Sequence, residues 1–211
     1  IIRGAETDRI SINGEDGTPS QTELEGCLEE VIMVYVFMAN GTEEIESLTV
    51  VDLLRRVGID VLTVSITGEK IIKGARGIEI VCDKLLDEID NDADCLVLPG
   101  GMPGTTNLEK CGVLMDMVRA QNEKKKLVAA ICAAPTILGH IGLLKEHKAC
   151  CYPNMEGELD CREVTYSNVT VSDNIITSRG LGTAIDFSLT ITELLTNKAT
   201  SDSLASKIVY N

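Results

Sequence analysis

Continuous apolar runs alternate with segments of helical periodicity from residue 31 onward. The run VIMVYVFM at 31–38 predicts a strand buried on both faces. After the turn at Asn40-Gly41, apolar residues recur at helical spacing from Ile45 to Val57, which predicts a helix. The same alternation continues along the chain. It predicts further strands at 60–66, 78–82, 94–98 and 127–131, and further helices at 108–122, 134–144, 183–195 and 201–210.

Shorter β segments are expected in the later part of the chain, at 150–152, 163–166, 169–172 and 175–177. Buried strands that alternate with amphipathic helices are typical of an α/β domain with a mostly parallel sheet and helices on both faces. Ligands of such folds gather at the carboxyl ends of the strands. We therefore expect functional residues at those ends.

Residues 1–30 differ from the rest of the chain. They contain eight acidic residues against Arg3 and Arg9, a net charge of −6, and little periodicity. This composition favours a flexible acidic extension with a short helix near 22–30. We expect residues 31–211 to form one α/β domain.

The whole chain has 211 residues and a net charge of −14, which argues against nucleic acid or an anionic membrane as a partner. No segment resembles a signal peptide, and no apolar run approaches the roughly 20 residues of a membrane span. The expected location is therefore cytoplasmic, in a reducing compartment.

Eight cysteines and two histidines, His140 and His147, limit the possible chemistry. No cysteine pair has the CxxC spacing of a zinc or dithiol site, so we expect no metal. A disulfide and a single nucleophilic thiol both stay open as roles for a cysteine at this point.

Cys132 lies where the apolar run 127–131 meets a helix that has Pro135 near its first turn. This pattern predicts a nucleophile elbow, which lifts one side chain clear of the sheet. A helix N-terminus favours thiolate over thiol and is expected to lower the thiol pKa. A buried cysteine in an alanine-rich core segment is the alternative that this pattern leaves open.

Two further segments end strands with polar or glycine-rich chemistry. The loop after residue 98 contains Gly100 and Gly101, and the N–H of Gly101 could form an oxyanion hole with that of Ala133; an ordinary βα loop is the alternative. The helix that follows the first strand opens with Glu43, Glu44 and Glu46. One of these carboxyls could exchange a proton with Cys132, although solvated capping residues would give the same pattern.

Taken together, these segments resemble the ThiJ/PfpI superfamily and, within it, the branch of the Parkinson disease protein DJ-one. The resemblance covers about residues 31–210 and rests on five motifs: GTEEIES at 41–47, VDLLRRVGIDV at 51–61, LPGG at 98–101, AAICAAPTIL at 129–138 and ITSRGLGTAIDF at 176–187. It implies a flavodoxin-like α/β sandwich, a homodimer and an added C-terminal helix.

The resemblance also implies roles for individual residues. Cys132 matches the reactive cysteine and Glu46 its protonated carboxyl partner, while Gly101 and Ala133 match the backbone donors. Arg55 and Arg76 match arginines near the dimer interface and the pocket rim, and together with Gly100 and Tyr152 they are expected as possible pocket residues. Tyr152 stands where many members have a histidine, which argues against a Cys–His protease dyad.

The function that the resemblance implies is a cofactor-independent glyoxalase or deglycase. It would act on methylglyoxal-type 2-oxoaldehydes and early glycation adducts, with Cys132 as nucleophile and Glu46 as proton shuttle. The alternative is a redox-sensing protein or chaperone of the oxidative-stress response, in which Cys132 is oxidised to sulfinate. Cys151 is a candidate for a second oxidation site or for a disulfide with Cys132.

Overall fold

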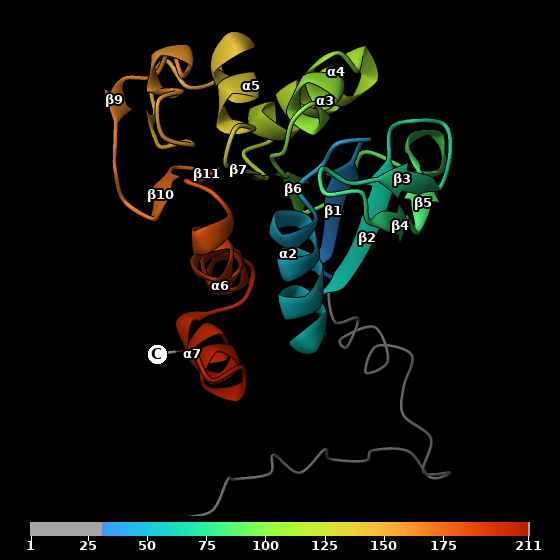
Figure 1. The fold of residues 1–211 in the computed structure, drawn as a ribbon. Coiled ribbons are helices and arrows are strands. Elements are labelled where there is room, and N and C mark those ends of the chain that lie inside the picture. Colours follow the sequence, from blue (N-terminus) through green and yellow to red (C-terminus); the bar gives the residue numbers. More distant parts are fainter. Residues whose placement is uncertain (1–30, 211) are drawn as a thin grey trace, which may run out of the picture. The chain divides into compact units, whose positions relative to one another are not determined.

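A computed structural model describes residues 31–210, and a seven-stranded sheet forms the centre of this unit. Its strands lie in the order β10-β11-β7-β6-β1-β2-β5 (Figure 1). All neighbours are parallel except β10, which runs antiparallel to β11 at one edge. The bounds are β1 Met33–Met38, β2 Asp60–Ser65, β5 Lys84–Leu85, β6 Cys95–Leu98, β7 Leu127–Ile131, β10 Val169–Ser172 and β11 Ile175–Ser178.

Helices cover both faces of the sheet, as the sequence predicts (Figure 1). One face packs against α2 (Glu44–Arg56) and α6 (Ala184–Leu195), and α7 (Lys198–Lys207) packs on α6. The other face packs against α3 (Gly104–Glu109), α4 (Gly112–Glu123) and α5 (Pro135–His140). Three 3₁₀ turns occur within residues 31–210: η1 Leu86–Glu88, η2 Glu156–Glu158 and η3 Leu181–Thr183.

Alternate residues of β1 enter two separate cores. Tyr35 and Phe37 pack with residues of α4 and α5, whereas Val36 and Met38 pack with residues of α2 and α6. Successive side chains of a strand point to opposite faces, so a strand with helices on both sides must be apolar throughout. This explains the uninterrupted apolar run that the sequence shows. The predicted α/β fold is confirmed.

The bounds of several elements differ from the sequence-based predictions. Strands β7 and β10 lie where they were predicted. The helix predicted at 108–122 is instead two helices, α3 and α4, because Cys111 between them has extended backbone with ψ of 96°. The helix predicted at 134–144 ends at His140, since Gly142 has a φ of +78° that no helix accommodates.

Smaller β elements also differ. Residues 150–152 are not a strand; the pairing instead joins β8 (Lys148–Ala149) to β9 (Glu163–Val164). The segment predicted at 78–82 is β4 (Glu79–Val81), which pairs with β3 (Ile71–Lys73), a strand that was not predicted. Helix α7 begins earlier than predicted because the Asn197 side chain caps it by accepting the Thr200 N–H at 3.0 Å.

The acidic segment 1–30, with its predicted flexibility and its short helix near 22–30, lies outside the described residues. Within residues 31–210, every helix is too short or too polar to cross a lipid bilayer.

Candidate active site

Cys132 stands on a sharp turn between β7 and α5. Its backbone φ is +65°, a left-handed conformation that residues other than glycine rarely adopt. Its N–H donates to the carbonyl of Ser178 at 2.9 Å, and the Ala134 N–H closes the turn on Ile131 O at 3.1 Å. The predicted elbow is therefore present, and it holds Cys132 at the carboxyl end of the sheet.

Glu46 comes to the same point from the first turn of α2. Its side chain is buried, with 1% of the residue exposed, and Oε2 accepts the Gly100 N–H at 3.0 Å. The carboxyl also accepts the Leu181 N–H and shares a hydrogen bond with the Cys132 thiol. Of the three glutamates that open α2, Glu46 is the one that contacts the cysteine.

Two backbone N–H groups, those of Ala133 and Gly101, donate hydrogen bonds to the Cys132 sulfur. Gly101 reaches this position with a φ of +91°, and a Cβ there would lie 2.3 Å from the Glu43 nitrogen. Only glycine fits such a position. The structure thus brings the two predicted donors together at the sulfur.

Burial raises the pKa of Glu46 to about 7, and the negative charge of Glu43 acts in the same direction. The hydrogen bonds from Cys132, Gly100 and Leu181 oppose this rise because they favour the carboxylate. Glu46 can therefore both accept and release a proton near neutral pH.

The pKa of the Cys132 thiol differs from the expected direction. Burial, followed by the charge and the hydrogen bond of Glu46, raises this pKa to about 12, although the N–H groups of Ala133 and Gly101 lower it. The prediction of a lowered pKa was wrong because it considered only the helix N-terminus. Since the effect of Glu46 depends on its negative charge, the thiolate is favoured when Glu46 holds the proton.

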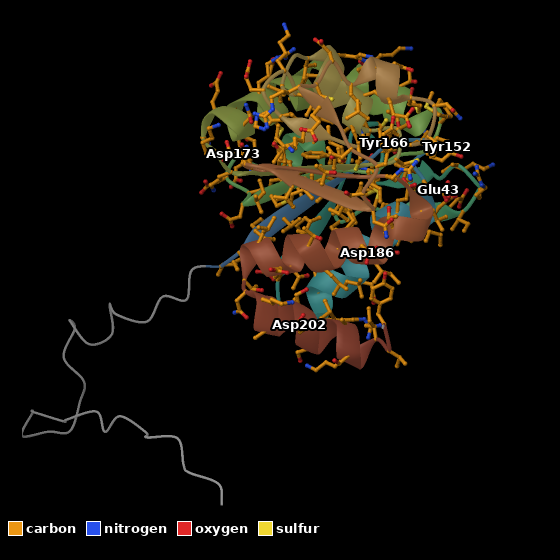
Figure 2. The ribbon with its side chains drawn as sticks, turned by 90° about the vertical axis from the view of Figure 1, so that its left-hand side faces the viewer. Glu43, Tyr152, Tyr166, Asp173, Asp186 and Asp202 are labelled. Atoms are coloured by element: carbon orange, nitrogen blue, oxygen red, sulfur yellow. The ribbon has the colours of Figure 1, made fainter. Side chains whose placement is uncertain are left out.

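The sulfur opens into a pocket of about 430 Å³. Tyr152, which is 51% exposed, forms part of the wall, and Arg76 lies at the rim with its guanidinium 3.6 Å from a Glu43 oxygen. Figure 2 shows Glu43 and Tyr152 at this edge of the molecule. The lining residues are Glu43, Glu46, Arg76, Gly101, Met102, Cys132, Ala133, Tyr152, Met155 and Leu181.

Two predicted pocket residues lie elsewhere. Arg55 is at the opposite end of α2 from Glu46, where it donates to the Asp83 carboxylate and to the Val61 carbonyl, both at 2.7 Å. It holds α2 to the sheet and does not line the pocket. Gly100 also does not line the pocket; it packs beneath the Cys132–Glu46 pair.

Neither histidine lines the pocket. His140, at the end of α5, lies 2.6 Å from a Glu109 oxygen, and His147 contacts the carbonyl of Ser172 at 3.1 Å. Cys151 is buried in the core, and both Cys151 and Cys132 are free thiols. The disulfide considered from the sequence is therefore not formed in this structure.

Leu181, Met102 and Met155 line the pocket although the sequence did not single them out. Leu181 acts through its backbone N–H, which every residue type except proline supplies. The one signal for it was its position in the motif at 176–187. Met102 likewise follows the glycine pair that the sequence did identify.

The DJ-1/PfpI family model matches residues 33–194. The chain belongs to the DJ-1/PfpI family. Protein DJ-1 homolog B of Arabidopsis thaliana is 41% identical over 168 residues, which are 78% of this chain and 38% of that protein. The chain thus spans less than half the length of this plant relative.

Other relatives match over most of their own length. The Caenorhabditis elegans protein named glutathione-independent glyoxalase DJR-1.2 is 36% identical, over 77% of this chain and 87% of that protein. Among solved structures, oxidized Toxoplasma gondii DJ-1 superposes with a TM-score of 0.82 at 35% identity, covering 85% of this chain and 98% of that one. These matches support the flavodoxin-like sandwich expected for the fold.

Proposed function

We propose that this chain is a cofactor-independent, cysteine-dependent glyoxalase. It converts 2-oxoaldehydes such as methylglyoxal to 2-hydroxy acids and acts on early glycation adducts by the same chemistry. The main support is the hydrogen bond between the Cys132 thiol and the buried Glu46 carboxyl at the base of an open pocket. The C. elegans relative named as a glyoxalase supports the same class of reaction.

The reaction begins with transfer of the Cys132 proton to Glu46. The thiolate attacks the aldehyde carbon of methylglyoxal and forms a C–S bond, and the carbonyl electron pair moves to the oxygen. The N–H groups of Ala133 and Gly101 face the sulfur and are placed to stabilise this oxyanion. Protonation gives a hemithioacetal.

An internal oxidation and reduction follows. Glu46 as carboxylate removes the proton from the former aldehyde carbon, giving an enediolate. The carboxylic acid then returns this proton to the neighbouring carbon, and the hydroxyl proton passes from the first oxygen to the second, which leaves a thioester with a hydroxyl group on the neighbouring carbon. The first carbon is thereby oxidised and the second reduced, so no external oxidant is needed. Water then cleaves the thioester to release lactate and the thiol.

The test is lactate formation from methylglyoxal by wild type, Cys132→Ser, Glu46→Gln and a matched control, Cys111→Ser. Cys111 lies between α3 and α4, away from the pocket lining. We expect the first two variants to lose at least a hundredfold in kcat/KM, since nucleophile or proton transfer is removed. Unchanged turnover by Cys132→Ser would overturn the proposal.

A redox-sensing role is the second candidate, because a solved relative, Toxoplasma gondii DJ-1, is oxidized. Each molecule of hydrogen peroxide would transfer one oxygen atom to the sulfur, and its other oxygen would leave as water. The first molecule gives the sulfenate and the second gives the sulfinate. The donors around Cys132 would stabilise the anionic product. Mass spectrometry after mild peroxide should find sulfinate first on Cys132, and equal oxidation of buried Cys95 would argue against this role.

We also propose that two copies associate through the exposed apolar side of α2. Ile45 and Leu48 are 48% and 36% exposed there, and they line a depression of about 400 Å³ together with Ile185 and Ile208. Sedimentation should show a dimer for the wild type and a monomer for Ile45→Lys. A dimer that persists in this variant would place the interface elsewhere.

A further inference from the structure

A second groove, of about 310 Å³, opens directly beside the catalytic pocket. Tyr152 and Leu181 line both cavities. Gly180 lies between them: a Cβ at this residue would be 3.5 Å from the Tyr152 ring and 3.9 Å from the Cys132 sulfur. Gly180, which lines the groove, therefore lies beside the reactive sulfur, and the two cavities share part of their walls.

Strand register places Arg179 in this groove. Ile131 at the end of β7 pairs with Ser178 at the end of β11, so the next residue on each strand emerges at the same edge of the sheet. On β7 that residue is Cys132, and on β11 it is Arg179. The Arg179 N–H donates to the Asn168 carbonyl at 3.3 Å, and its guanidinium carbon lies 5.9 Å from the centre of the Tyr166 ring.

Arg179 differs from Arg76, the other arginine beside the cysteine, in having no carboxylate partner in the part of the chain that the structure describes. Arg76 has a carboxylate partner in Glu43. Within residues 31–210, Arg179 has no carboxylate oxygen within 4.0 Å. The nearby acid Asp186 accepts instead from Asn168 at 2.9 Å and from the Tyr210 hydroxyl at 2.7 Å. The groove thus presents an unpaired guanidinium, and a guanidinium binds a carboxylate through paired hydrogen bonds.

A hydrogen-bonded turn forms part of the groove wall. The Thr183 hydroxyl accepts the Gly180 N–H at 3.1 Å and donates to the Gly180 carbonyl at 2.8 Å, which fixes the turn at η3. Methylglyoxal, with five heavy atoms, would fill only a small part of the pocket and none of the groove. The space beyond the cysteine is suited to a substrate with a larger attached group.

We propose that this groove is a second substrate subsite in which Arg179 binds a carboxylate on the group attached to the reacting 2-oxoaldehyde. The inference rests on the proposed function. It makes Arg179 a specificity-determining residue, so that the protein prefers carboxylate-bearing adducts, such as those of an amino acid, to their neutral counterparts. The tyrosines beside Arg179 provide flat apolar surface for the body of the group.

Turnover of a matched substrate pair tests the preference. The pair is 4-carboxyphenylglyoxal and 4-carbamoylphenylglyoxal, which differ in charge but little in size, with methylglyoxal as the common reference. We expect wild type to favour the carboxylate about tenfold in kcat/KM, from one charged hydrogen-bonded contact. Arg179→Gln should abolish the preference and Arg179→Lys should keep part of it. Arg119→Gln, on α4, makes the same charge change and should keep it fully. A preference that survives Arg179→Gln would overturn the inference.

Binding of the inert products separates this inference from the proposed reaction. Calorimetry would compare 4-carboxymandelate with 4-carbamoylmandelate on the Cys132→Ser protein, which needs no turnover. We expect Kd to be about tenfold lower for the first compound, and equal for both when Arg179→Gln is added. If this holds but no oxoaldehyde is turned over, the subsite stands and the proposed reaction fails. If turnover proceeds and both compounds bind equally to Cys132→Ser, the subsite is wrong.

Discussion

Gly100 donates its backbone N–H to Oε2 of Glu46 across 3.0 Å, and so joins the loop after β6 to the first turn of α2. The Gly100 carbonyl accepts the Glu43 N–H at 2.9 Å, which makes a second bond between the same two segments. The carboxyl that faces Cys132 is therefore oriented by main-chain groups. Its position depends on the backbone path at Gly100.

Gly100→Ala should disturb this arrangement. The new Cβ would lie 2.6 Å from Cys132 Cβ and 2.7 Å from Glu46 Oε2. Both distances are shorter than a van der Waals contact, so either the loop at Gly100 or one of the two side chains must move. We expect a loss of about 1–3 kcal/mol in the free energy of unfolding and at least a tenfold loss of lactate formation. Gly112→Ala, where a Cβ meets nothing within 4 Å, is the matched control for urea unfolding and turnover. Wild-type turnover by Gly100→Ala would contradict the geometry.

Glu46 should make stability depend on pH. Its pKa is about 7 in the folded chain against the ordinary value of 4.5, so between these values the folded state holds a proton that the unfolded state has lost. The stability that this proton contributes is complete below pH 4.5 and is lost as pH rises through about 7. The total is about 3 kcal/mol. In urea unfolding across this range, Glu46→Gln should lack this component and exposed Glu193→Gln should retain it. If the free energy of unfolding changed with pH in the same way for wild type and Glu46→Gln, Glu46 would not be the source of the pH dependence.

Glu43→Gln should lower the pKa of Glu46. The negative charge of Glu43 is one cause of the raised pKa, and its removal also releases Arg76 from its ion pair. Carbon NMR titration of the Glu46 carboxyl would measure the change. Glu123→Gln, at the exposed end of α4, removes an equal charge and should leave the pKa where it is. An unchanged Glu46 titration in Glu43→Gln would show that the two carboxyls are not coupled.

The left-handed backbone at Cys132 should be measurable as strain. Glycine adopts a φ of +65° without steric cost, whereas alanine does not. We therefore expect Cys132→Gly to be more stable than Cys132→Ala, with a free energy of unfolding about 0.5–1 kcal/mol higher. The neighbouring Ala133 lacks a positive φ, so Ala133→Gly should show the opposite sign. Equal stability of the two Cys132 variants would mean that the elbow is unstrained.

Much of this fold follows from local pattern. A strand buried on both faces must be apolar throughout, so β1 and β7 are visible in the sequence, and the cysteine at the end of β7 is visible with them. The break between α3 and α4 is not, because apolar residues keep helical spacing across Cys111. What ends the helix there is a backbone dihedral angle that the side-chain pattern does not determine.

Local sequence pattern predicts part of the candidate site but not the properties that depend on segments far apart in the chain. Cys132, Gly101 and Ala133 were predicted from strand ends and lie together. The pKa of the thiol was predicted in the wrong direction because it depends on burial and on Glu46, which arrives from a distant segment. Arg55 was placed near the pocket by resemblance, yet the length of α2 separates it from Glu46.

The hydrogen bond from Cys132 to Ser178 has a consequence for the order of events during synthesis. The backbone partner of the cysteine, and the Leu181 N–H that the Glu46 carboxyl accepts, both come from the chain at and after β11. During translation the cysteine leaves the ribosome well before these residues do. The nascent protein therefore carries an ordinary thiol, and the reactive centre is assembled only once β11 has joined the sheet.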